Sequence, residues 1–148
     1  MKKTNYLTTL LFAILIILGA CKPDPPAPEP TEEEVKLESL STSTWIYSSV
    51  TLDGVEPPID FSAFTITLSN NFTYSITGNP ANTPWPSTSG EWDFKTDDLN
   101  TVIRQPDGVE ITTTVTDTSL KLEFDYTPPT GGRVSGITGR WVFNMIPQ

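Results

Sequence analysis

Few residue types in this chain of 148 residues could do covalent or metal chemistry. The sequence has no histidine, the side chain that serves most often as a general base and as a transition-metal ligand. It has one cysteine, Cys21, so no intrachain disulfide can form. No Gly-x-Ser-x-Gly motif presents a serine nucleophile. The carboxylates mostly alternate onto polar strand faces, which gives them no reason to act as catalytic acids. We expect no catalytic residue, no cofactor and no enzymatic activity.

One cluster of acidic residues has the ligand type that a cation would need. Glu91, Asp93, Asp97 and Asp98 fall close together around a predicted turn. Oxygen ligands suit Ca²⁺, but this spacing does not match the 12-residue calcium loop. Acidic residues at a strand end are normally solvated, so we expect no metal site.

Three residues are candidates for contact with a ligand or a partner. Trp85 lies between Pro84 and Pro86, outside any strand pattern. The prolines restrict its backbone, so the ring is either presented rigidly to a partner or folded back as a lid over one end of the domain. Arg133 and Arg140 each carry a planar fork that could bind a ligand carboxylate, with pairing to surface acids as the alternative.

The segment before Cys21 has the pattern of an export signal. A basic head, Met1-Lys2-Lys3, precedes an apolar run from Leu7 to Leu18. Leu18-Gly19-Ala20-Cys21 comes next, and this box resembles the bacterial lipoprotein signal at all four positions. The alternative, a transmembrane helix, needs about 20 apolar residues, more than this run supplies.

The lipoprotein resemblance implies where the mature protein resides. It implies cleavage before Cys21 and acyl chains on that residue, which would tether the protein to a membrane. Lys22, not Asp, comes after the cysteine. The inner-membrane retention signal of enterobacterial lipoproteins is therefore absent, which points to the outer membrane. The cell surface is narrowly favoured over the periplasmic side.

The mature chain is acidic and begins with a proline-rich segment. The full sequence has nine basic and 18 acidic residues, and loss of Lys2 and Lys3 would leave a net charge near −11. Such a surface repels phosphate backbones, so we expect no nucleic-acid partner. Residues 22–31 are rich in proline and predict an extended linker that reaches about 30 Å. Thr31 and Glu34 match a capping box for a short helix.

From Thr44 onward, apolar and polar residues alternate with a period of two. This pattern is typical of antiparallel strands that have one apolar face and one wet face. The expected strands are 44–52, 61–69, 71–78, 90–95, 99–104, 108–116, 119–127 and 134–146.

Turn residues separate these strands, and no helical pattern lies between them. Asparagines at 70–71 and Pro106-Asp107-Gly108 are typical of tight turns. Successive hairpins predict a meander, and eight strands can close it into an antiparallel up-and-down barrel without exposed edges. An open β-sandwich is the alternative fold.

Residues 38–146 are similar to small lipocalin-like lipoproteins of Bacteroidota-type bacteria. The likeness rests on the segments 40–45, 53–54, 89–94 and 136–143. Lipocalin-like domains open with Gly-x-Trp, and here Ser43 stands in the glycine position. The resemblance carries over only Trp45, whose role in the family is to close one end of the barrel.

These observations divide the chain into a signal peptide (1–20), a lipid-anchored linker (21–37) and a lipocalin-like domain (38–148). We expect Trp45, Trp92 and Trp141 in its core, and a monomer. One hypothesis is a carrier of a small apolar or amphipathic ligand. The other is a filled barrel that serves as an accessory or interaction subunit of an outer-membrane complex. A chamber of several hundred Å³ would favour the carrier, and a solid interior the accessory role.

Overall fold

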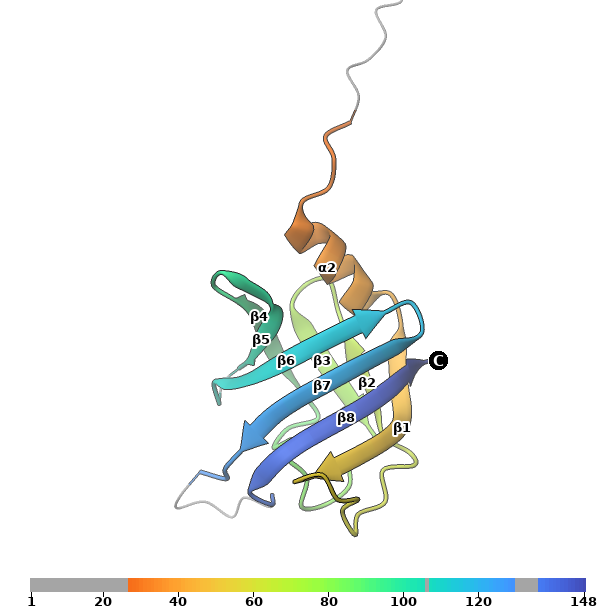
Figure 1. Cartoon of the computed structure of the whole chain (residues 1–148), viewed down its shortest axis with the longest axis vertical. Coiled ribbons are helices and arrows are strands. Elements are labelled where there is room, and N and C mark those ends of the chain that lie inside the picture. The colour runs from red at the N-terminus through yellow and green to blue at the C-terminus, as the bar shows by residue number, and fades with distance from the viewer. Residues whose placement is uncertain (1–26, 106, 130–135) are drawn as a thin grey trace, which may run out of the picture.

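The structure, a computed structural model, describes residues 27–105, 107–129 and 136–148. Eight antiparallel strands pair in sequence order, and β1 pairs with β8 to close a barrel (Figure 1). This confirms the predicted up-and-down barrel, and the closing pair rules out the open sandwich. The strands are β1 (Thr44–Leu52), β2 (Thr65–Leu68), β3 (Thr73–Thr77), β4 (Ser89–Lys95), β5 (Asp98–Arg104), β6 (Val109–Thr116), β7 (Ser119–Tyr126) and β8 (Gly139–Pro147).

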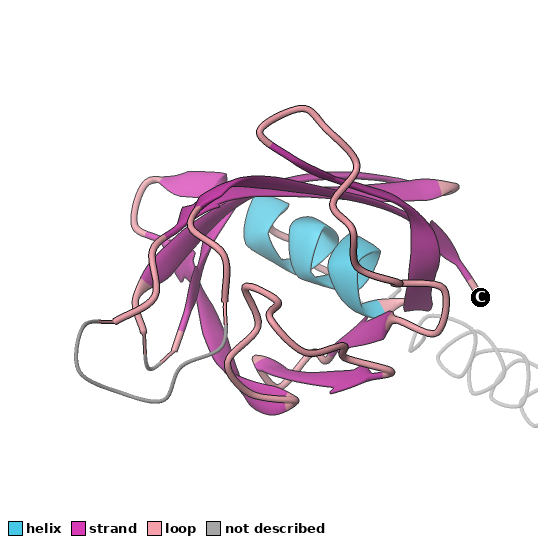
Figure 2. Ribbon diagram, turned by 90° about the horizontal axis from the view of Figure 1, so that it is seen from below, coloured by secondary structure: helices cyan, strands magenta, loops and turns pink. Residues whose placement is uncertain are grey.

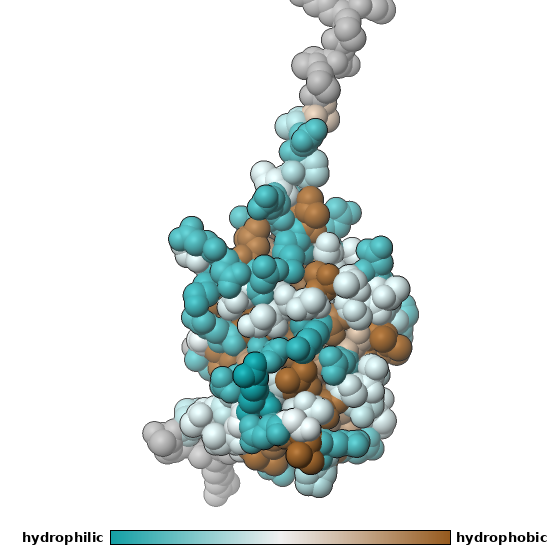
Figure 3. All heavy atoms as spheres, in the orientation of Figure 1, coloured by the Kyte–Doolittle hydropathy of each residue, from teal (hydrophilic) through white to brown (hydrophobic). Residues whose placement is uncertain are grey.

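The alternation in the sequence becomes an inner and an outer barrel face. Residues opposite each other on neighbouring strands share a face, so apolar partners such as Ile66 and Ile76 both point into the lumen. Leu122 and Phe143 do the same across β7 and β8. On the outside, Figure 3 shows mostly polar residues over β6, β7 and β8, with isolated apolar ones. The three core tryptophans are buried as predicted, since Trp45, Trp92 and Trp141 are at most 3% exposed.

Two of the predicted strands begin at least four residues later in the structure. β2 was expected from residue 61 but begins at Thr65. Residues 61–64 form a turn instead, in which the N–H of Phe64 donates a hydrogen bond to the carbonyl of Phe61. Both rings are buried in the core, so the apolar pattern there reflects a packed turn and not a strand. β8 was expected from residue 134 and begins at Gly139.

A helix covers one end of the barrel. α2 (Glu32–Ser41) starts with the predicted capping box, in which Thr31 accepts from the N–H of Glu34 at 3.2 Å. It lies across the lumen, as seen along the barrel in Figure 2. Leu40 is fully buried, and its carbonyl accepts from the indole N–H of Trp45 at 3.0 Å. The folded unit therefore includes the whole helix, and the expected boundary between 37 and 38 falls inside it.

The two ends of the barrel differ in their connections. The helix end carries α2 and the short turns β2–β3, β4–β5 and β6–β7. The loop end carries the other four connections, including residues 53–64 and 78–88. Residues 27–31 leave the barrel at the helix end (Figure 1). Among the described residues, no helix is both long and apolar enough to cross a membrane.

Candidate functional site

Of the predicted contact residues, Arg140 lies on the outer wall. Its side chain is 61% exposed and forms an ion pair with Glu123, which also pairs with Lys121 at 2.7 Å. These contacts hold the pKa of Glu123 below its usual range. Arg140 thus pairs with a surface acid, the alternative that the sequence left open. Arg133 and Cys21 lie outside the described residues.

Trp85 is inside the barrel and not on its surface. It is 3% exposed, so the expectation of a ring folded back from the loop is confirmed, and the expectation of an accessible contact is not met. The ring lies in the lumen, with centroids 5.5–6.2 Å from those of four aromatic residues. These neighbours are Phe64, Tyr74, Phe124 and Phe143.

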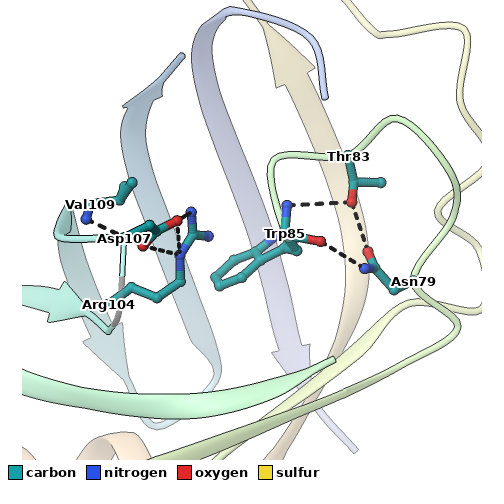
Figure 4. Close-up of polar contacts among 6 residues, drawn as sticks. All are labelled: Asn79, Thr83, Trp85, Arg104, Asp107 and Val109. Carbon is teal, nitrogen blue, oxygen red and sulfur yellow. Dashed lines mark hydrogen bonds and ion pairs between the residues drawn. The ribbon is translucent and has the colours of Figure 1, made fainter. Parts of the chain in front are cut away.

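The connection β3–β4 places Trp85 through contacts of its own (Figure 4). Asn79 donates its amide N–H to the carbonyl of Trp85 at 3.1 Å and accepts from the hydroxyl of Thr83 at 2.9 Å. The N–H of Trp85 donates to the same hydroxyl at 3.4 Å. Gly78 starts the loop with φ of +61°, and a Cβ there would lie 2.0 Å from the carbonyl oxygen of Ala63. Hydrogen bonds within the loop, together with the close approach of Gly78 to Ala63, therefore fix a backbone that points the indole into the lumen.

Arg104 lies beside that indole, at the end of β5. Its side chain is 1% exposed and faces the lumen. Nε and Nη2 donate to Asp107 in a two-point contact, at 3.1 Å to Oδ1 and 2.6 Å to Oδ2. The guanidinium carbon also lies 4.8 Å from the centroid of Trp85, a cation–π distance (Figure 4). Asp107 and Trp85 together hold the one charged side chain that is buried in the described interior.

Sequence reasoning missed Arg104 because the alternation of β5 is ambiguous. Leu99, Thr101 and Ile103 form the more apolar set, yet Val102 and Arg104 face the lumen. The pairing register of β5 with β4 decides which β5 side chains face the lumen, because Trp92 on the inner face of β4 lies opposite Arg104. Asp107, three residues further on in a predicted tight turn, was the available signal for a local ion pair.

Three buried polar atoms at this site have no hydrogen-bond partner among the described residues. They are Nε1 of Trp85, Nη1 of Arg104 and the hydroxyl of Tyr126. The guanidinium carbon of Arg104 is 5.8 Å from the ring centroid of Tyr126, so the arginine adjoins both rings. By contrast, the indole N–H groups of the other tryptophans all donate to backbone carbonyls. Buried donors are normally satisfied, so this cluster is exceptional within the fold.

Burial moves the pKa of the two tyrosines near Arg104 further above neutral pH. Loss of solvent contact raises the pKa of Tyr74 and of Tyr126, while the nearby guanidinium opposes that shift. Both hydroxyls therefore stay protonated at neutral pH and remain hydrogen-bond donors. The Tyr126 hydroxyl adds a second donor beside Arg104 at the loop end of the lumen.

The cavity in the barrel interior is small. It has a volume of about 20 Å³ and is lined by apolar side chains together with Trp85 and Arg104. This is the scale of one water molecule, whereas ligand chambers usually measure about 300–1,000 Å³. The interior is therefore solid, as the hypothesis of a filled barrel requires, and a loop residue completes the filling.

The predicted acidic cluster does not form a metal-binding group. Asp98 accepts from Thr101 at 2.7 Å and from the N–H of Asn100 at 3.0 Å, which lowers its pKa. Asp93 accepts from the N–H of Phe94 at 2.8 Å. In the described part of the chain, no three acidic side chains come together as cation ligands would.

Fold and site together define a class of protein: a closed eight-stranded antiparallel barrel, consistent with a lipocalin-like all-β fold, whose lumen is filled by an indole stacked on a buried arginine. Comparison with protein-family models, with curated proteins and with solved structures gave no match for this chain.

Proposed function

We propose that this protein is a lipid-anchored, non-catalytic accessory subunit of the bacterial cell envelope. The observation that carries the proposal is the solid interior, whose cavity of about 20 Å³ leaves no room for a carried molecule in this state. The lipoprotein-like box that ends at Cys21 supports the anchor. A stable barrel with a filled core is suited to present its surface to another macromolecule.

The loop end is the surface that faces away from the proposed anchor. Residues 27–31 and α2 lie at the opposite end, so a lipid on Cys21 would hold the helix end toward the membrane. Two of the exposed large apolar residues, Val55 (69% exposed) and Ile137 (38% exposed), lie on loop-end connections. These connections adjoin because β1 pairs with β8. They form the contact surface that we assign to a partner.

Photo-crosslinking in intact cells tests the accessory role. A photoreactive amino acid at position 55 should give one adduct of defined mass, and Cys21→Ser should abolish it by releasing the protein from the membrane. The matched control is position 146 on β8, where Ile146 is 44% exposed near the helix end. Equal labelling at both positions, or no adduct at either, would contradict the proposal.

A second candidate function is that of a carrier for a small amphipathic molecule. The structure would then be the form of the carrier that holds no ligand. This candidate is favoured by two observations: the Trp85 side chain in the lumen comes from a loop, and the Arg104 guanidinium beside it has a donor without a described partner. Native mass spectrometry of protein taken from envelopes tests the carrier. A small molecule bound in stoichiometric amount would support it, and a mass equal to that of the lipidated chain would count against it.

A further inference from the structure

The Arg104 guanidinium has one donor group that nothing in the described structure uses. Asp107 takes Nε and Nη2, and Nη1 remains buried without a partner. A buried donor that has lost its water and gained no acceptor destabilises the fold. The neighbouring hydroxyl of Tyr126 is in the same condition. A ligand with acceptor atoms would remove both defects, and a carboxylate suits them because its two oxygens can accept several hydrogen bonds at once.

The Trp85 indole indicates the shape of the rest of the ligand, the part to which this carboxylate would be attached. It is planar, it lies 4.8 Å under the guanidinium, and aromatic rings pack around it. It also lines the 20 Å³ cavity, so the space it fills and that cavity are continuous. Without the indole, the lumen would hold an apolar chamber of about that shape with Arg104 on its wall.

We propose that Trp85 occupies the binding site of a small organic anion, and that Arg104 binds the carboxylate of this ligand while the apolar lumen holds its planar body. The assignment deepens the carrier candidate and rests on it, not on the accessory role. Trp85 is in this view an internal substitute for the ligand, and ligand binding displaces it.

The loop contacts are compatible with displacement of the indole. The hydrogen bonds that shape residues 79–85 are made within the loop itself, between Asn79, Thr83 and Trp85. The indole N–H makes no hydrogen bond to any described residue of the barrel. The ring is thus held by apolar and cation–π contacts, which a guest of similar shape would reproduce. Strand pairing need not change, because none of these bonds belongs to the β-ladder.

The test compares indole-3-acetate with indole-3-acetamide, which has nearly the same shape and no charge. Isothermal titration uses the full lipidated chain in nanodiscs, with empty nanodiscs as the blank. In Trp85→Gly, we expect the carboxylate to bind at least tenfold more tightly than the amide. In the wild type, it should bind at least tenfold more weakly than in Trp85→Gly, because the indole must leave first.

Substitution of Arg104 attributes the preference to its guanidinium. Trp85→Gly/Arg104→Gln should bind both probes about equally, and binding of the amide shows that the chamber persists. If that variant does not fold, Arg104→Lys replaces it; the lysine lacks the fork that serves Asp107 and the ligand together, so the preference should fall at least threefold. Trp85→Leu replaces Trp85→Gly if the glycine variant does not fold.

Each outcome decides a different point. Equal binding of both probes to the Trp85 variant would overturn the anion site and leave a carrier of neutral molecules. A preference that persists without Arg104 would also overturn it. If a folded Trp85 variant binds neither probe, both the anion site and the carrier fail, and the accessory role still rests on its own crosslinking test.

Discussion

Replacement of Trp85 by alanine tests whether the loop residue belongs to the core. Truncation of a buried tryptophan costs about 3–5 kcal/mol. The loss includes contacts with four aromatic rings and a desolvated cation–π contact with Arg104. It is partly offset because the unpartnered indole N–H, a defect of about 1–3 kcal/mol, disappears with the ring. We expect a net loss of about 2 kcal/mol, which is the middle of the first range less the middle of the second, out of a total of about 5–15 kcal/mol for a typical domain.

The phenylalanine variants provide the sharper comparison. Trp85→Phe keeps a ring in the lumen and removes an N–H that has no partner, so its cost should be within about 1 kcal/mol. Trp141→Phe removes an N–H that donates to the carbonyl of Ile137 at 3.0 Å, so it should cost more by about 1–2 kcal/mol. Both rings are at most 3% exposed, which matches the two sites in burial.

Urea unfolding followed by far-ultraviolet circular dichroism measures these differences. A change in midpoint at constant slope reports stability alone. If Trp85→Ala were within about 1 kcal/mol of the wild type, the indole would not be a core residue and the account of the lumen would be wrong. A cost for Trp85→Phe as large as for Trp141→Phe would show that the Trp85 N–H has a partner after all.

Further predictions concern the anchor, the buried ion pair and the loop. Cys21→Ser should move the protein from the membrane to the soluble fraction, and an unmodified Cys21 in a soluble mature wild-type chain would contradict the anchor. Protease shaving of intact cells should remove the barrel if it lies at the cell surface, whereas protection would place it on the periplasmic side. Asp107→Asn leaves the Arg104 charge buried and uncompensated and should cost about 3–5 kcal/mol by urea unfolding, with Arg104→Met/Asp107→Asn less harmful. Gly78→Ala should be far more destabilising than Gly108→Ala in the same assay, because both have positive φ but only the first would bring a Cβ against backbone.

The barrel could be predicted from the sequence because strand periodicity is a local property. Each strand shows its apolar face within a few residues, as Leu120, Leu122 and Phe124 do on β7, and short polar turns imply that neighbours in sequence pair. The helix could be predicted from its capping box in the same way. Its place across the barrel end depends on Leu40 and Trp45, which meet only in the folded chain.

The candidate site could not be predicted because it depends on contacts between distant segments. Trp85 has no periodic pattern around it, and its burial depends on rings from four other parts of the chain. Arg104 points into the lumen because β5 pairs with β4 so that Arg104 lies opposite Trp92. The sequence of β5 alone does not reveal this register. Phe61 and Phe64 show the converse error, since the sequence placed both in a strand and their backbone forms a turn.

The even number of strands has a consequence for the geometry of any fusion or tag. A meander of eight strands must return its last strand to the end where the first began, and the N–H of Gln148 donates to the carbonyl of Thr44 at 2.9 Å. A reporter fused after Gln148 would therefore emerge beside α2, on the side that the proposed linker joins to the bilayer. That end is the one nearer the membrane, even with a linker that reaches about 30 Å. Epitopes for use on intact cells belong instead in the connections at the opposite pole, such as the tip at Gly54.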